Sequence, residues 1–66
     1  MSVAKVIEIC SESATSFEDA ITAGIRQAQK TLSNVRGAWV KEQKVTVRDG
    51  KIVAYRVYLK LTFVLE

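Results

Sequence analysis

The sequence predicts an α+β domain in which a three-stranded antiparallel sheet curves around one helix, in the order strand, helix, strand, strand. Three observations predict this fold. Every second residue from Val53 to Leu65 is apolar, which is the period of a strand with one buried face. Between Phe17 and Leu32, apolar residues recur at spacings of three and four, as on an amphipathic helix. Asp49-Gly50 separates two strand-like stretches and favours a two-residue hairpin.

The first predicted strand spans Val3 to Ser11, where Val and Ile are enriched. Both of its sides are partly apolar, with Ile7 and Ile9 on one side and Val6 and Cys10 on the other. We therefore expect cover on both faces over part of its length, which implies a partner. Cys10 is predicted to be a small buried hydrophobe rather than a reactive thiol.

The predicted helix runs from Phe17 to about Leu32, with Ser16 as its N-cap. Glu18 and Asp19 place negative charge at the positive end of the helix dipole. The apolar stripe is expected to pack on the apolar face of the last strand; it consists of Phe17, Ile21, Ile25, Ala28 and Leu32. Small residues, among them Gly24, allow the sheet to approach closely, and Ser33-Asn34 ends the helix.

The second strand, Ala38 to Val47, is expected to pair with the last strand, Ile52 to Leu65, through the Asp49-Gly50 turn. In a regular hairpin with this loop, the numbers of opposed residues sum to 99, which fixes the two faces. The helix side would pair Val40 with Leu59 and Ala38 with Leu61. The other face would pair Trp39 with Lys60, Lys41 with Tyr58, Gln43 with Arg56, and Val45 with Ala54.

The 66 residues form one predicted domain, residues 1–66, that is too small to be very stable alone. A strand from Ile52 to Leu65 would reach roughly 46 Å, whereas a compact chain of this size is about 28 Å across. One Cys and no His leave no disulfide or zinc site within the chain, so oligomerisation is the remaining means of stabilisation. We expect a cytoplasmic protein, because the single Cys leaves no disulfide framework, and a soluble one, because no apolar run has signal-peptide or membrane-span length.

The composition argues against several function classes. The net charge is +3 and the basic residues are scattered, which is not the pattern of a dedicated nucleic-acid binder. The chain has no His base, no Gly-rich phosphate loop and no nucleophile with a visible activator, so it is not predicted to be an enzyme. No carboxylate cluster has calcium-loop spacing, so no metal site is predicted within one chain.

Trp39 is the strongest candidate for function. It is interpreted either as a tryptophan buried at a subunit contact or as a platform on which a planar ligand stacks. Arg56, expected beside Gln43, presents donors to carbonyl or phosphate oxygens or forms an intersubunit salt bridge. A third possibility is a small nucleic-acid module that exposes Trp39, Tyr58, Lys41 and Lys60 as a stacking surface, which requires a monomer or dimer.

Four stretches together resemble the dodecins over essentially the whole chain. These are the opening Val3 to Ile9, the helix start Thr15 to Ala20, the run Asn34 to Gln43, and the ending Tyr55 to Glu66. The resemblance implies a hollow homododecamer in which each curved sheet wraps a helix, and which binds riboflavin or FMN in stacked pairs to store it, without catalysis. It also implies an alternative, a similar shell that holds another anionic cofactor, such as coenzyme A, or metal ions such as calcium.

The resemblance implies four cofactor-binding positions: Trp39, Gln43, Arg56 and Gly37. Gly37 stands where flavin-binding dodecins usually have the stacking tryptophan, and Arg56 where they have a glutamine that grips the ring. Trp39 lies two residues along the same strand face, about 6.6 Å away. This displacement shifts the flavin stack or abolishes it, and the cation at Arg56 favours anionic partners.

Overall fold

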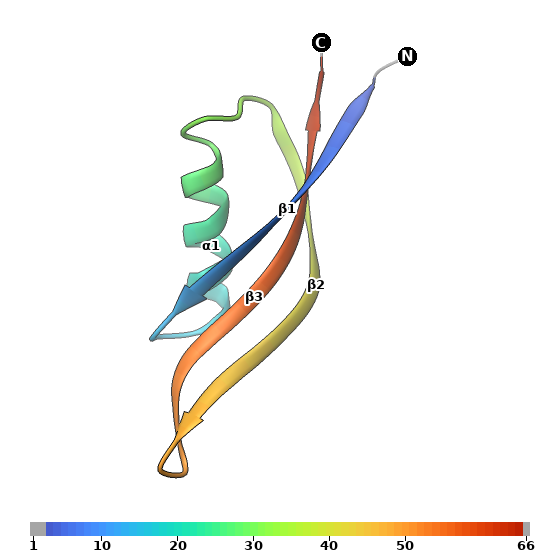
Figure 1. Ribbon diagram of the computed structural model, residues 1–66. Helices are drawn as coiled ribbons and strands as arrows, with labels where there is room; N and C mark the ends of the chain where they lie inside the picture. Colours follow the sequence, from blue (N-terminus) through green and yellow to red (C-terminus); the bar gives the residue numbers. More distant parts are fainter. Residues whose placement is uncertain (1–2, 66) are drawn as a thin grey trace.

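The computed structural model describes residues 3–65 and contains four elements in the predicted order. They are β1 (Ala4–Ser13), α1 (Phe17–Ala28), β2 (Val35–Arg48) and β3 (Lys51–Val64). The strands form one antiparallel sheet in the order β1-β3-β2, so β3 is central, and α1 lies against one face (Figure 1). The predicted fold class is therefore confirmed. Met1, Ser2 and Glu66, at the ends of the predicted patterns, lie outside the described residues.

The core lies between α1 and β3. Val57, Leu59 and Leu61 on β3 are fully buried, as is Ala20 on the helix, and Phe63 is 8% exposed. Phe17, Ile21, Ile25 and Ala28 of the predicted helix stripe pack against this cluster, together with Ile7 and Ile9 of β1. The period-two pattern of the last strand thus identified the buried face correctly in its middle, whereas Val53 and Leu65 at its ends are 40% and 52% exposed.

The helix begins as predicted and ends earlier than predicted. The Ser16 hydroxyl accepts a hydrogen bond from the Asp19 N–H at 3.0 Å, which is an N-cap. After Ala28 the chain turns, because Lys30 and Thr31 donate to carbonyls three residues back, at 3.2 Å each. Leu32 is therefore outside the helix. Within residues 3–65, no helix is long and apolar enough to cross a membrane.

Gly24 allows α1 to lie close to β1. A Cβ atom at this position would be 3.0 Å from the Ser11 Cβ and 3.4 Å from the Ile9 Cδ1. A side chain here would push the helix away from the edge strand. This agrees with the expected role of the small helix residues.

The hairpin turn has the predicted residues in the predicted conformation. Asp49 has a φ of 52° and Gly50 a φ of 75°, as a type I′ turn requires. The predicted pairs of Trp39 with Lys60, Val40 with Leu59, and Ala38 with Leu61 are confirmed.

Between these confirmed pairs and the turn, the predicted register is wrong by one residue. Glu42, not Lys41, faces Tyr58; Gln43 faces Val57; Lys44 faces Arg56; and Val45 faces Tyr55. The reason is a pair of irregularities, one between Val40 and Glu42 and one between Thr46 and Val47. Lys41 is an extra residue on β2, and Val53 is an extra residue on β3. Each shifts the pairing by one residue in the opposite direction, so the register next to the turn again agrees with the prediction.

The β2–β3 hairpin runs past the end of the helix (Figure 1). The chain measures 51 × 20 × 13 Å along its principal axes, which confirms that the strands are longer than a compact domain. Beyond the helix, the helix-side face of the hairpin leaves apolar side chains uncovered, with Val47 59% and Ile52 51% exposed. We call Val45, Val47 and Ile52 the hairpin patch.

Candidate functional site

The candidate site lies on the sheet face turned away from α1, which we call the outer face. Opposed residues of neighbouring strands share a face, so this face follows from the register and from the burial of Val57, Leu59 and Leu61 on the other side. It carries aromatic and charged side chains from all three strands: Glu8, Cys10 and Glu12 on β1, Arg56, Tyr58 and Lys60 on β3, and Trp39, Lys41, Glu42 and Lys44 on β2.

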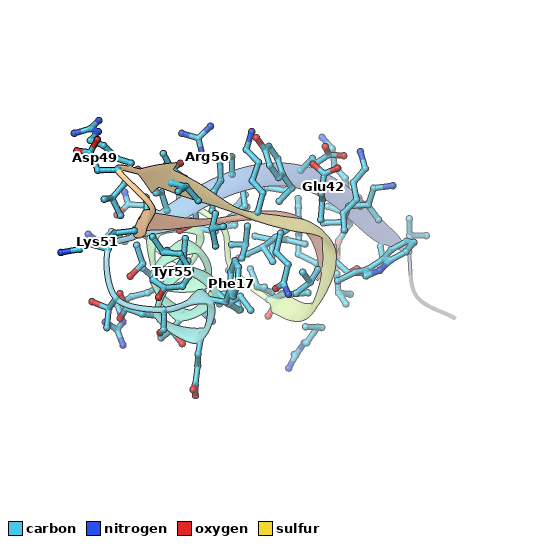
Figure 2. The ribbon with its side chains drawn as sticks, turned by 90° about the horizontal axis from the view of Figure 1, so that it is seen from below. Phe17, Glu42, Asp49, Lys51, Tyr55 and Arg56 are labelled. Atoms are coloured by element: carbon cyan, nitrogen blue, oxygen red, sulfur yellow. The ribbon has the colours of Figure 1, made fainter. Side chains whose placement is uncertain are left out.

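Figure 2 shows this separation of the two faces. Arg56 and Glu42 extend from one side of the sheet, while Tyr55 and Phe17 lie on the helix side. The two helix-side rings meet edge to face, with centroids 5.2 Å apart and planes at 80°. The core and the outer face thus use alternate residues of the same strand.

Trp39 is 65% exposed and lies at the β2 end of one row of the outer face, with Lys60 beside it on the central strand. The Lys60 Nζ lies 5.3 Å from the centroid of its ring, which is a cation–π contact. Such contacts are worth about 0.5–1 kcal/mol at exposed sites. Two residues before Trp39 on the same face, a Cβ atom at Gly37 would meet nothing within 4 Å. The indole therefore has a cation over its ring and open space at a neighbouring position.

Two ion pairs bridge β1 to the rest of the outer face. The Lys41 Nζ lies 3.2 Å from the Glu8 carboxylate, and the Arg56 Nη2 lies 2.9 Å from the Glu12 carboxylate. Arg56 also donates from Nε to the same Glu12 oxygen at 3.0 Å. The Tyr58 side chain and the Glu12 carboxylate raise the pKa of the Arg56 guanidinium, so it stays cationic at every physiological pH.

The structure does not bring the four predicted site residues together within one chain. Trp39 and Gly37 share the outer face, but the Lys41 bulge turns Gln43 to the helix side, opposite Val57, so its predicted pairing with Arg56 is wrong. Arg56 lies on the outer face, four residues along β3 from Lys60. This spacing puts Arg56 about 13 Å from the row of Trp39 and Lys60. The salt bridge that the structure records for Arg56 is to Glu12 of the same chain.

Two features of the outer face were not predicted from the sequence. The ion pair between Glu12 and Arg56 depends on the register between β1 and β3. These strands are joined through the helix, so no local sequence signal indicates their register. Cys10 is exposed, so its predicted burial is wrong, because its register opposite Tyr58 places it away from the helix.

Another place on the molecule has the shape of a binding site. A groove of about 400 Å³ lies between α1 and β1, lined mainly by apolar or small residues such as Ile7, Ile9, Ala23 and Leu32. Within residues 3–65, no group of three or more His, Cys, Asp or Glu residues is placed to hold a metal ion. The outer face around Trp39 therefore has the clearest arrangement for binding a ligand.

Comparison with known proteins gives a consistent result. The sequence matches the Dodecin family model over residues 3–66. It is 36% identical over 63 residues to calcium dodecin of Mycobacterium tuberculosis, covering 96% of this chain and 89% of that protein.

Solved dodecin structures match the whole fold. An arginine-to-alanine variant of the T. thermophilus dodecin superimposes with a TM-score of 0.94 at 33% identity, over 100% of this chain and 98% of that one. The crystal structure of the M. tuberculosis calcium dodecin, described as having a novel calcium-binding site, gives 0.84 at 38% identity, over 98% and 93%. From the family match, the curated relative and these structures, we conclude that the chain belongs to the dodecin family.

Proposed function

We propose that this chain assembles into a homododecameric shell and binds a flavin, FMN or riboflavin, between subunits without catalysing a reaction on it. The observation that carries the proposal is the exposed Trp39 indole, beside open space at Gly37, on a face rich in polar and charged groups. An exposed indole is a suitable platform for a planar conjugated ring. Storage of the flavin is the role that this arrangement fits, because the contact recorded for the indole among residues 3–65 is the single ammonium of Lys60 and not a pair of acid–base or nucleophilic groups.

A second copy of the chain is needed to complete such a site. A single indole contacts only one face of a flavin ring, and ligand sites normally bury most of the ligand surface. Gln43 and Arg56 are remote from Trp39 within the chain, so contacts from these two side chains to a ring on Trp39 would come from another subunit. The uncovered hairpin patch supports self-association on independent grounds.

The test is titration of FMN and riboflavin with protein of verified oligomeric size, followed by flavin fluorescence. We expect saturable quenching, because stacking on an indole quenches the excited flavin. Trp39→Ala should abolish it, and Trp39→Phe should retain weaker binding because an aromatic ring remains. Saturable quenching of equal strength in Trp39→Ala, or none by an intact wild-type assembly, would refute the proposal.

Calcium binding is the second candidate, and a specific observation favours it: the 36% identical relative is named a calcium dodecin. On the outer face, Glu8 and Glu12 are held in ion pairs, whereas the structure records none for Glu42 among residues 3–65. A calcium ion needs six to eight oxygen ligands, so carboxylates from several copies would have to meet.

Calorimetric titration of the metal-free assembly with CaCl₂ distinguishes the two candidates. Calcium storage predicts saturable heat that Glu42→Gln removes and Glu18→Gln, a substitution on the helix, leaves intact. The flavin proposal predicts quenching with no such heat.

A further inference from the structure

Four cations of the outer face lie away from the hairpin turn, and they differ in what holds them. Lys41 is bound by Glu8 and Arg56 by Glu12, at 3.2 and 2.9 Å. Lys44 lies opposite Arg56, away from the Trp39 row. Lys60 lies opposite Trp39, with its ammonium 5.3 Å from the indole centroid, and among residues 3–65 the structure records no ion pair for it.

We propose that Lys60 makes the Trp39 site selective for phosphorylated flavins over riboflavin, by binding the phosphate of a flavin that stacks on the indole. This inference rests on the proposed flavin function and adds to it the chemical class of the ligand and the residue that selects it. Lys60 is the cation in contact with the platform. Its ammonium has three donors and, among residues 3–65, the structure records no carboxylate bound to them, so a phosphate can accept from it directly.

The contact between Lys60 and the indole leaves the ammonium available. A cation over an exposed ring is held far more weakly than one hydrogen-bonded to phosphate, so an arriving ligand displaces it from the ring while the flexible side chain keeps its ammonium nearby. Riboflavin has the same ring but no phosphate, and it gains nothing from this charge. The discrimination between the two flavins therefore depends on Lys60.

The negative charge of Glu8 lowers the preference for FMN over riboflavin. Glu8 lies opposite Lys60 on β1, and its two oxygens are 3.2 and 3.4 Å from the Lys41 Nζ. Removing its charge would free Lys41 and remove the carboxylate nearest the row of Lys60 and Trp39. The phosphate of the ligand would then meet a more positive surface.

The experiment measures the dissociation constants of FMN and riboflavin by fluorescence quenching, at one ionic strength, and compares their ratio between variants. Lys60→Gln should lower the preference for FMN roughly tenfold, the usual size of one charge-assisted hydrogen bond. Lys60→Arg should retain it. Lys51→Gln removes the same charge from the other end of β3 and should leave the ratio unchanged. Glu8→Gln should raise the preference.

Each outcome distinguishes this inference from the flavin function itself. Unaltered riboflavin binding by Lys60→Gln, with FMN binding weakened to the riboflavin level, supports the inference. An unchanged ratio in Lys60→Gln, with both flavins still quenched, overturns it and leaves the flavin function standing. Loss of both flavins in Lys60→Gln also overturns it, because Lys60 would then only support the indole. If the wild-type assembly quenches neither flavin, the proposed function fails and this inference fails with it.

Discussion

The hairpin patch gives a prediction about assembly that can be worked from exposure. Val47 and Ile52 face each other across the hairpin, on the helix side but beyond the end of the helix, and are 59% and 51% exposed. Burying a whole Val or Ile side chain is worth about 1.5–3 kcal/mol. Covering the exposed half of both by another copy therefore contributes about 2–3 kcal/mol per chain, roughly a hundredfold in the association constant.

We expect Val47→Asp to disrupt the assembly. The substitution removes the apolar contact and places a carboxylate where a neighbouring subunit would desolvate it, which costs several kcal/mol more. Sedimentation velocity over a range of protein concentrations measures the outcome. The variant should sediment as monomers or small oligomers at concentrations where the wild type is fully assembled.

Thr46→Asp is the matched control. Thr46 is the preceding residue on the same strand, and its register opposite Ala54 places it on the outer face. The Thr46→Asp variant introduces the same negative charge and the same residue type, Asp, which is unfavourable in strands. It therefore separates loss of the apolar contact from general weakening of the hairpin. If Val47→Asp assembles as fully as the wild type and Thr46→Asp, the idea that a second copy covers the hairpin patch is wrong.

Four further predictions concern the fold and the site. Leu59→Ala should reduce the free energy of unfolding by about 2–5 kcal/mol in urea titration, since Leu59 is fully buried beneath α1. Gly50→Val should cost about 1–2 kcal/mol in the same assay, because φ is 75° in the turn. Gly24→Leu should reduce the free energy of unfolding by about 1–3 kcal/mol, because even a Cβ would lie 3.0 Å from the Ser11 Cβ. Gly37→Leu should be tolerated, because a Cβ there meets nothing within 4 Å. Deletion of Lys41 removes the extra residue of β2; the circular dichroism spectrum should be preserved, but flavin quenching should weaken. Lys41→Ala keeps the extra residue and should bind flavin more like the wild type.

Most of the fold could be predicted because local signals agreed with one another. The alternation along β3, the three-and-four spacing of α1 and the Asp49-Gly50 turn each have a local physical cause, and the structure confirms all three. The early end of α1 at Ala28 was missed because Leu32 continues the apolar period beyond the last helical residue. Periodicity shows which face is apolar, but hydrogen bonding decides where a helix stops.

The candidate site was harder to predict than the fold because its residues come from three strands. Trp39 and Lys60 were paired correctly by counting from the turn only because the extra residue on β2 offsets the extra residue on β3. The Arg56–Glu12 ion pair depends on the register between β1 and β3, which are joined through the helix rather than by a turn. No local rule fixes that register. Contacts between copies of the chain are still more remote from any pattern in one sequence.

The bulge at Lys41 did leave a signal in the sequence, and it explains how β2 serves both faces. Apolar residues occupy even positions at Ala38 and Val40 but odd positions at Val45 and Val47. Strict alternation cannot place all four on the helix side, so one extra residue is required between Val40 and Val45. That residue is Lys41, which turns toward Glu8 on the outer face and so adds a cation beside the Trp39 row. The same insertion that keeps the valines on the helix side therefore concentrates charge on the outer face.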